Sequence, residues 1–192
     1  MAKVRDSGMP SQELWESFFD ADAVLAALGY QELTDDAIEF GCGYGTFTLP
    51  AARRTSGIVY ALDIDPLMVA ATAERAARAG LRNVVAEERD FLVMSCGRPA
   101  GSVGYVMLFN ILHVENPTTL LREAYRVLRP AGLAGIMHWN RDARTPRGPP
   151  LEIRPSVQQC QLWGEAVGLR SAGACELPGC PWHWGLILSK PG

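Results

Sequence analysis

Three glycines alternate with other residues at Gly41, Gly43 and Gly45, directly after an apolar run that contains the acidic Glu39. Glycine lets the backbone turn sharply, adopt positive φ and approach a ligand without a Cβ in the way. A helix-compatible segment, 46–54, follows the turn. A strand that stops in such a turn and feeds a helix forms a nucleotide-type site at its carboxyl end. The feature therefore favours an α/β protein with a nucleotide-like ligand.

The rest of the chain alternates apolar runs with helix-compatible segments, which predicts α/β layers around a mostly parallel sheet. Helices should begin at Pro66, at Pro117 and after Ser156, where capping residues precede apolar periodicity. Only about seven residues connect the last two apolar runs, so the final strand should run antiparallel to its neighbour. The expected strands are 37–41, 58–63, 83–86, 103–110, 133–139, 169–175 and 183–188.

We expect one domain over 1–192, with a helical cap at 1–30 and a Rossmann-like, doubly wound core at 36–192. The cap contains an amphipathic pattern that predicts a single helix over 11–28. The formal charge of −3 gives no electrostatic reason to expect a nucleic-acid or membrane partner. Five scattered cysteines and a first segment unlike a signal peptide favour the cytoplasm. The pattern leaves the oligomeric state open.

Polar residues follow the expected strands at the edge where ligands bind in this architecture. Asp63 ends the second strand, 20 positions beyond Gly43, and its carboxylate can accept two hydrogen bonds from a ribose. The third strand ends near Asp90 and Phe91, and the fourth runs out into Asn110. These residue types suit the sugar and the base of a nucleoside.

This order of motifs resembles the class I S-adenosylmethionine-dependent methyltransferases, and it is similar to their small-molecule, type 11-like branch. The resemblance covers roughly residues 36–140. The segments that carry it are the glycine turn, Asp63-Ile64-Asp65-Pro66, Arg89-Asp90-Phe91, Asn110-Ile111-Leu112-His113-Val114 and Leu121-x-Glu123-x-x-Arg126-Val127-Leu128-Arg129-Pro130-Ala131-Gly132. Ala131 stands where this family commonly has glycine, in a turn remote from the site.

The resemblance implies that S-adenosylmethionine is the cofactor and that S-adenosylhomocysteine is the product. The glycine turn would lie against the methionine part, Asp63 would hold the ribose, and Phe91 would lie at the adenine. Glu39 would orient the turn or the cofactor ammonium. The implied cofactor-binding residues are Glu39, Gly41, Cys42, Gly43, Gly45, Asp63, Ile64, Asp90, Phe91, Asn110 and Ile111.

The methyl acceptor is expected to be a small molecule. Methyltransferases of DNA amino groups carry two prolines after the fourth strand, where this chain has Ile111 and Leu112. Because a sulfonium is already activated, alignment supplies most of the catalysis, and a base is needed only for a protonated nucleophile. His183 and His113 are the candidate catalytic residues, although either histidine could instead have a structural hydrogen-bonding role. The candidate substrate contacts are Trp15, Phe18, Asn140, Arg141 and Trp182.

Two other functions are compatible with these motifs. An NAD-dependent oxidoreductase shares the fold and the acidic residue after the second strand, but its third glycine would stand at Thr46. A non-catalytic S-adenosylmethionine-binding partner or regulatory domain would keep the same motifs. We expect no metal site, because Cys175, Cys180 and His183 lack the close ligand pair usual for zinc.

Overall fold

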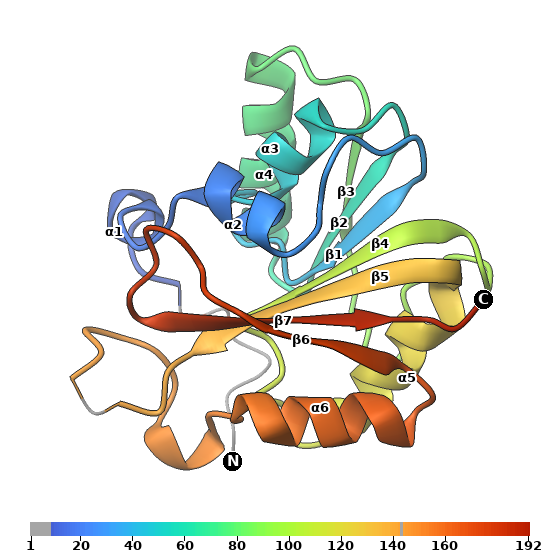
Figure 1. Ribbon diagram of the computed structural model, residues 1–192. Helices are drawn as coiled ribbons and strands as arrows, with labels where there is room; N and C mark the ends of the chain where they lie inside the picture. The colour runs from blue at the N-terminus through green and yellow to red at the C-terminus, as the bar shows by residue number, and fades with distance from the viewer. Residues whose placement is uncertain (1–8, 143) are drawn as a thin grey trace.

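Seven strands form one sheet in the computed structural model of the protein, which describes residues 9–142 and 144–192 (Figure 1). The strands are β1 (Ala37–Phe40), β2 (Val59–Asp63), β3 (Val84–Glu88), β4 (Val103–Phe109), β5 (Leu128–Trp139), β6 (Arg170–Cys175) and β7 (His183–Ser189). Their order is β3-β2-β1-β4-β5-β7-β6. Strands β1 to β5 pair in parallel, and β7 is antiparallel to both β5 and β6. The predicted fold class and the reversed last strand are confirmed.

The order of the strands reverses beside β1, so the loops after β1 and β4 lie next to each other at one edge. Such a switch point is where ligands bind in doubly wound sheets. The register places Phe40 opposite Leu62 and Glu39 opposite Met107, which brings the ends of three strands together. The sheet topology therefore positions the glycine turn between the ends of β2 and β4.

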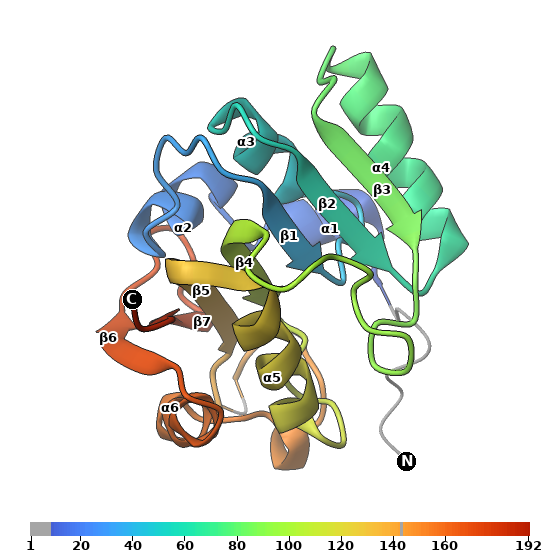
Figure 2. The same cartoon turned by 90° about the vertical axis from the view of Figure 1, so that its right-hand side faces the viewer.

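Helices cover both faces of the sheet, as the view in Figure 2 shows. Helices α2 and α3 pack on one face, and α5 and α6 pack on the other. Helix α4 packs against β2 and β3. The helices are α1 (Gln12–Glu16), α2 (Ala21–Ala27), α3 (Thr48–Arg53), α4 (Pro66–Arg78), α5 (Pro117–Val127), η1 (Leu151–Ile153) and α6 (Val157–Ala166).

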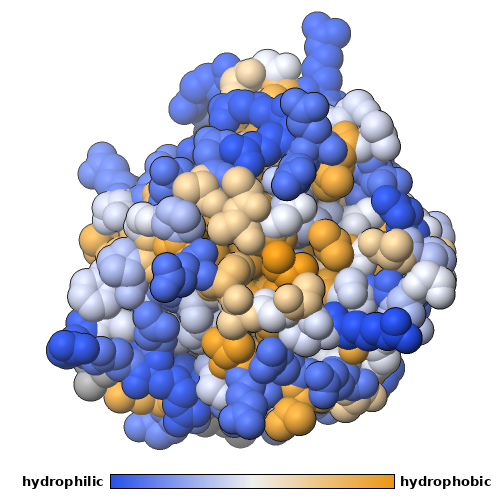
Figure 3. Space-filling model, viewed as in Figure 1, coloured by the Kyte–Doolittle hydropathy of each residue, from blue (hydrophilic) through white to orange (hydrophobic). Residues whose placement is uncertain are grey.

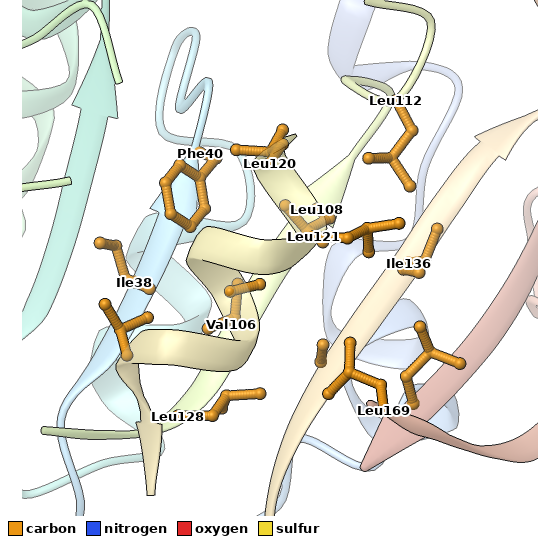
Figure 4. Packing of buried hydrophobic residues seen from close by; sticks show 14 of the residues in the cluster. Ile38, Phe40, Val106, Leu108, Leu112, Leu120, Leu121, Leu128, Ile136 and Leu169 are labelled. Carbon is orange, nitrogen blue, oxygen red and sulfur yellow. The ribbon is translucent and has the colours of Figure 1, made fainter. Parts of the chain in front are cut away.

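Two apolar clusters hold the layers together. The larger joins α5 and α6 to the sheet through residues such as Leu120, Leu121 and Ile136, all at most 1% exposed (Figure 4). Full burial of such a side chain stabilises the fold by about 1.5–3 kcal/mol. The second cluster joins α2 and α3 to the opposite face, with Leu25 and Met107 fully buried. Figure 3 shows hydrophobic residues gathered near the centre of the face seen in Figure 1. In the described chain, no helix has the length and apolarity needed to span a bilayer.

The N-terminal cap differs from the prediction. The prediction of a single helix over 11–28 is wrong, because the chain forms two short helices there, α1 and α2. The Ser17 hydroxyl donates to the carbonyl of Leu14 at 2.8 Å at the end of α1. The Asp20 carboxylate then accepts from the backbone N–H of Ala23 at 3.0 Å and caps α2. These short polar side chains favour helix ends over continuation. Residues 1–8 of the predicted cap lie outside the described chain.

Candidate functional site

The glycine turn after β1 adopts the backbone that only glycine tolerates well. The φ angles of Gly41, Gly43 and Gly45 are +80°, +53° and +73°. The backbone N–H of Gly45 donates to the carbonyl of Cys42 at 2.9 Å and closes the turn. A Cβ on Gly45 would lie 2.8 Å from Cδ1 of Leu49, so this glycine also permits close packing of α3. The turn is thus closed by its own backbone hydrogen bond and packs closely on α3.

Asp63 ties this turn to the end of β2. Its Oδ2 accepts from the backbone N–H of Gly43 at 2.9 Å, and its Oδ1 accepts from that of Asp65 at 3.0 Å. Asp65 caps α4 by accepting from the N–H of Leu67 at 2.9 Å, as the sequence predicts. Burial raises the pKa of the Asp63 carboxyl above its usual range. Asp63 therefore supports the turn and reaches its open side at the same time.

Glu39 is buried under the same turn, with 2% of its surface exposed. The hydroxyl of Thr48, in the first turn of α3, donates to its carboxyl. Burial raises the pKa of Glu39 to about 8. A carboxyl in this state is largely neutral at pH 7 and becomes ionised when a cation lies beside it. The site thus contains an acidic group that a positively charged ligand can ionise.

A cavity of about 130 Å³ opens between the turn and the ends of β2 and β4. Both side-chain polar atoms of Asn110, Oδ1 and Nδ2, are buried in this region without a partner in the described chain. Buried polar groups are normally satisfied, so this amide is free to bind a polar ligand. The lining residues are Met9, Trp15, Glu39, Gly41, Cys42, Gly43, Phe47, Asp63, Ile64, Phe91, Phe109, Asn110, Ile111 and His113.

The chain ahead of β1 covers this small cavity. Met9 Cε lies 3.1 Å from the position that a Cβ on Gly43 would occupy. The Tyr44 hydroxyl donates to the carbonyl of Pro10 at 2.8 Å. Arg75 of α4 forms an ion pair with Glu16 of α1 at 2.7 Å. The segment 9–16 therefore forms a cover that α4 and the glycine turn hold by polar contacts.

A larger cavity of about 1080 Å³ adjoins the small one. Ile64, Phe91 and His113 line both cavities, so they form the boundary between them. The remaining lining residues of the large cavity are Arg89, Asp90, Leu92, Leu112, Val114, Glu115, Asn116, Pro117, Thr119, Arg141, Glu152, Ile153, Arg154, Pro155, Gln159 and Trp163.

His113 is the only predicted catalytic residue that the structure brings to a cavity in the described chain. Its Nδ1 lies 3.2 Å from Nε2 of His138, near the end of β5. Burial lowers the pKa of His113 to about 4, so the ring is neutral at pH 7. A neutral imidazole at the boundary of two cavities can exchange a proton with a group on either side.

The structure places His183 elsewhere. Strand β7 does start at the expected edge, where Trp139 pairs with His183. The ring nevertheless packs against Phe19 and Trp139, with centroids 4.8 and 4.1 Å away, and lines neither cavity. Burial lowers its pKa to about 3. Its side chain points to the α1–α2 side of the sheet, which strand direction alone does not predict.

The structure brings two of the five predicted substrate contacts to a cavity and places the other three elsewhere. Arg141 lines the large cavity, whereas Trp15 lines the small one. Phe18 packs edge-to-face on Trp139 at 5.4 Å, away from both cavities. The backbone N–H of Asn140 donates to the carbonyl of Trp182 at 2.8 Å, so these two residues join strand ends and line neither cavity. The structure therefore does not bring Phe18, Asn140 and Trp182 to the site.

Several residues that line the large cavity could not be predicted as site residues from the sequence pattern. Ile153, Gln159 and Trp163 come from the segment between β5 and β6, which crosses the edge of the sheet. Arg154, 6% exposed, fixes the path of this segment by donating to the carbonyls of Asn140, Arg147 and Pro149 and to the Thr145 hydroxyl. The Ser156–Gln159 capping box predicts where α6 begins, but not that the helix lines a cavity.

The sequence of this chain matches the family described as the methyltransferase domain over residues 37–132, half of its length. The chain belongs to this methyltransferase family. Membership confirms the resemblance to class I S-adenosylmethionine-dependent methyltransferases and decides against an NAD-dependent oxidoreductase. Comparison with curated proteins gives no match. In the described part of the methyltransferase, no group of three or more His, Cys, Asp and Glu side chains could hold a metal ion.

Solved structures share the fold over nearly the whole chain. A SAM-dependent methyltransferase from Aquifex aeolicus is 25% identical, with a TM-score of 0.80 and coverage of 97% of this chain and 96% of that one. The [4+2]-cyclase SpnF is 17% identical, with a TM-score of 0.75 and coverage of 97% and 84%. A geranyl diphosphate methyltransferase in complex with GPP and sinefungin is 14% identical, with a TM-score of 0.71 and coverage of 88% and 77%. The last two likenesses concern the fold alone.

Proposed function

We propose that this protein transfers a methyl group from S-adenosylmethionine to a small-molecule acceptor bound in the large cavity. One observation carries the proposal: two adjoining cavities share a boundary formed by Ile64, Phe91 and His113. A methyltransferase must hold donor and acceptor on either side of one reacting carbon. Adjoining sites supply the alignment on which such a reaction mainly depends.

The small cavity suits the amino-acid and ribose parts of the cofactor. Its volume of about 130 Å³ is below the ~300–1,000 Å³ usual for ligand sites, so the adenine extends along Phe91 into the edge of the larger cavity. The free amide of Asn110 and the ionisable Glu39 suit a zwitterionic amino acid. The geranyl diphosphate methyltransferase of this fold is in complex with sinefungin, an observation about that protein which agrees with such a ligand. When bound, S-adenosylmethionine supplies a methyl group on a sulfonium.

The rest of the large cavity suits the acceptor. Apolar side chains of Leu112, Ile153 and Trp163 line it together with the charged groups of Arg141 and Glu152. Its volume of about 1080 Å³ fits a small organic molecule. Because both charge signs are present, the cavity favours no polyanion, and we propose neither nucleic acid nor membrane as a partner. The five cysteines are free thiols, which suits a reducing compartment, and we propose the cytoplasm.

Binding and consumption of the cofactor test this function. Calorimetry should detect S-adenosylhomocysteine binding and no NADH binding. A metabolite screen with methyl-labelled S-adenosylmethionine should then yield one labelled product. Trp163→Ala should raise the KM for that acceptor and leave the affinity for S-adenosylhomocysteine unchanged, because Trp163 lines only the large cavity and not the small one. A protein that binds S-adenosylhomocysteine yet labels nothing would instead be a non-catalytic binding domain.

A further inference from the structure

All three histidines of the chain lie at the same edge of the sheet, after β4, near the end of β5 and at the start of β7. Two of them are in direct contact, since His113 Nδ1 and His138 Nε2 are 3.2 Å apart. One nitrogen of such a pair must donate and the other must accept. The direction of this hydrogen bond decides whether the outer nitrogen of His113, Nε2, carries a proton or a lone pair.

The surroundings of His138 favour one direction. Its ring is fully buried and stacks on Trp184, with a centroid distance of 6.2 Å and an interplanar angle of 26°. Its Nδ1 faces the backbone carbonyl of Trp139 at 3.5 Å. A carbonyl oxygen can only accept, so the proton of a neutral His138 belongs on Nδ1. Its Nε2 then carries a lone pair and accepts from Nδ1–H of His113.

We propose that His138 is a positioning residue that holds His113 in the Nδ1–H tautomer, so that Nε2 of His113 accepts the proton of a hydroxyl on the methyl acceptor. This inference deepens the proposed function and rests on it for the identity of the reaction. His113 would be the group that touches the acceptor, and His138 would act only through it. The arrangement fixes a hydrogen-bond acceptor at the boundary of the two cavities.

The bonds and charges of this step balance. With the cofactor bound, the carbon–sulfur bond to the methyl group would break and the carbon–oxygen bond would form, while Nε2 of His113 would take the O–H proton of the acceptor. The positive charge thus passes from the sulfonium to the imidazole, and water then removes the proton. The charged side chains that line the large cavity with His113 are Arg89, Asp90, Glu115, Arg141, Glu152 and Arg154.

The lone pair that the His113–His138 hydrogen bond leaves on Nε2 of His113, at the boundary of the two cavities, favours an acceptor atom that must lose a proton as it is methylated. With a pKa of about 4, this imidazole is far too weak a base to deprotonate an alkylammonium group, whose pKa is about 10. A hydroxyl differs because its O–H proton becomes strongly acidic as the oxygen gains the methyl group. A weak base can then take the proton late in the transfer. The position of this lone pair, together with the low pKa of the ring, favours an alcohol or a phenol over a protonated alkylamine as the acceptor.

Nitrogen-15 NMR of the imidazoles tests the tautomer without any acceptor or cofactor. The chain has three histidines, so single substitutions assign every ring. We expect His113 in the Nδ1–H tautomer in the wild type. His138→Gln, which keeps an oxygen acceptor near the position of Nε2, should preserve that tautomer, whereas His138→Leu should lose it. His183→Leu is the matched control, because His183 is a buried histidine of the same edge whose ring packs on Phe19 and Trp139.

An Nε2–H tautomer of His113 in the wild type would overturn the proposal, and so would an unchanged spectrum of His113 in a folded His138→Leu variant. The wild-type spectrum decides even if that variant fails to fold. The labelled product of the metabolite screen tests the acceptor class: an O-methyl product supports it, and an N-, C- or S-methyl product overturns it. Failure to bind S-adenosylhomocysteine would refute the proposed function and leave the tautomer result standing.

Discussion

The backbone N–H of Gly43 donates to Oδ2 of Asp63 across 2.9 Å, which joins the loop after β1 to the end of β2. The two residues are 20 positions apart, and the carboxylate also accepts from the backbone of Asp65. The residue expected to hold a ribose is therefore also the residue that fixes the glycine turn. Loss of this carboxylate should change the turn and the ligand affinity together.

Asp63→Asn tests this coupling. An amide keeps one acceptor but directs an NH₂ group at a backbone N–H, so at least one of the two hydrogen bonds breaks. Hydrogen bonds to a charged group contribute about 1.5–3 kcal/mol. We expect at least tenfold weaker binding of S-adenosylhomocysteine in calorimetry and a lower melting temperature. Asp65→Asn is the control, because asparagine caps helices as well as aspartate does. Equal affinities of the two variants would refute the role of Asp63.

Glu39→Gln should change how stability depends on pH. Burial raises the pKa of Glu39 to about 8, whereas a glutamate in the unfolded chain titrates near about 4.3. The folded state thus binds more protons between these values, so the free energy of unfolding falls as pH rises through this window. Glutamine cannot titrate, and the variant lacks this contribution.

The measurement is urea unfolding at pH 5, 7 and 9. The variant should gain stability relative to the wild type as pH rises from 5 to 9. Glu74→Gln, which removes an exposed carboxyl from α4, is the control. A difference between Glu39→Gln and wild type that stays constant with pH would contradict a buried, protonated Glu39.

Local signals predict most of this fold and part of its candidate site. Asp65 and Pro66 determine where α4 begins, and the short link before β7 determines its direction. The glycine turn and Asp63 follow from strand ends at a switch point. The positions of His183 and Arg154 could not be predicted in this way. Which sheet face His183 presents depends on register, and the partners of Arg154 are backbone groups in an irregular segment.

Gly45→Ala and Gly80→Ala separate backbone strain from packing. Both glycines have positive φ, +73° and +70°, so each alanine meets a similar backbone penalty of roughly 1–2 kcal/mol. A Cβ on Gly80 meets nothing within 4 Å, whereas one on Gly45 lies 2.8 Å from Leu49 and 3.0 Å from Thr72. Overpacking costs a further ~1–3 kcal/mol. We expect Gly45→Ala to lower the urea midpoint more than Gly80→Ala does, and equal midpoints would contradict the close packing.

Tyr44→Phe should loosen the cover over the small cavity. The hydroxyl of Tyr44 holds the carbonyl of Pro10 at 2.8 Å, and a neutral hydrogen bond contributes about 0.5–1.5 kcal/mol. We expect S-adenosylhomocysteine to dissociate roughly two- to tenfold faster in stopped-flow measurements. Tyr60→Phe, which removes a hydroxyl of β2 that donates to Asp36, should leave the dissociation rate unchanged. The same rate in all three proteins would mean that segment 9–16 does not retain the ligand.

Arg154→Lys should release the segment that lines the large cavity between β5 and α6. The buried guanidinium donates four hydrogen bonds, at 2.7 Å to Pro149, 2.7 Å to Asn140, 2.6 Å to Thr145 and 3.1 Å to Arg147. A lysine ammonium cannot reach four acceptors that lie far apart, because all its N–H groups extend from a single nitrogen atom.

We expect the loss of at least about 2 kcal/mol of unfolding free energy and faster cleavage of this segment by a protease. Arg144→Lys is the matched control, since Arg144 pairs with Asp142 at the surface and its side chain is 85% exposed. Its unfolding midpoint should stay close to that of the wild type. If both variants resist unfolding and proteolysis equally, Arg154 does not hold the wall of the large cavity.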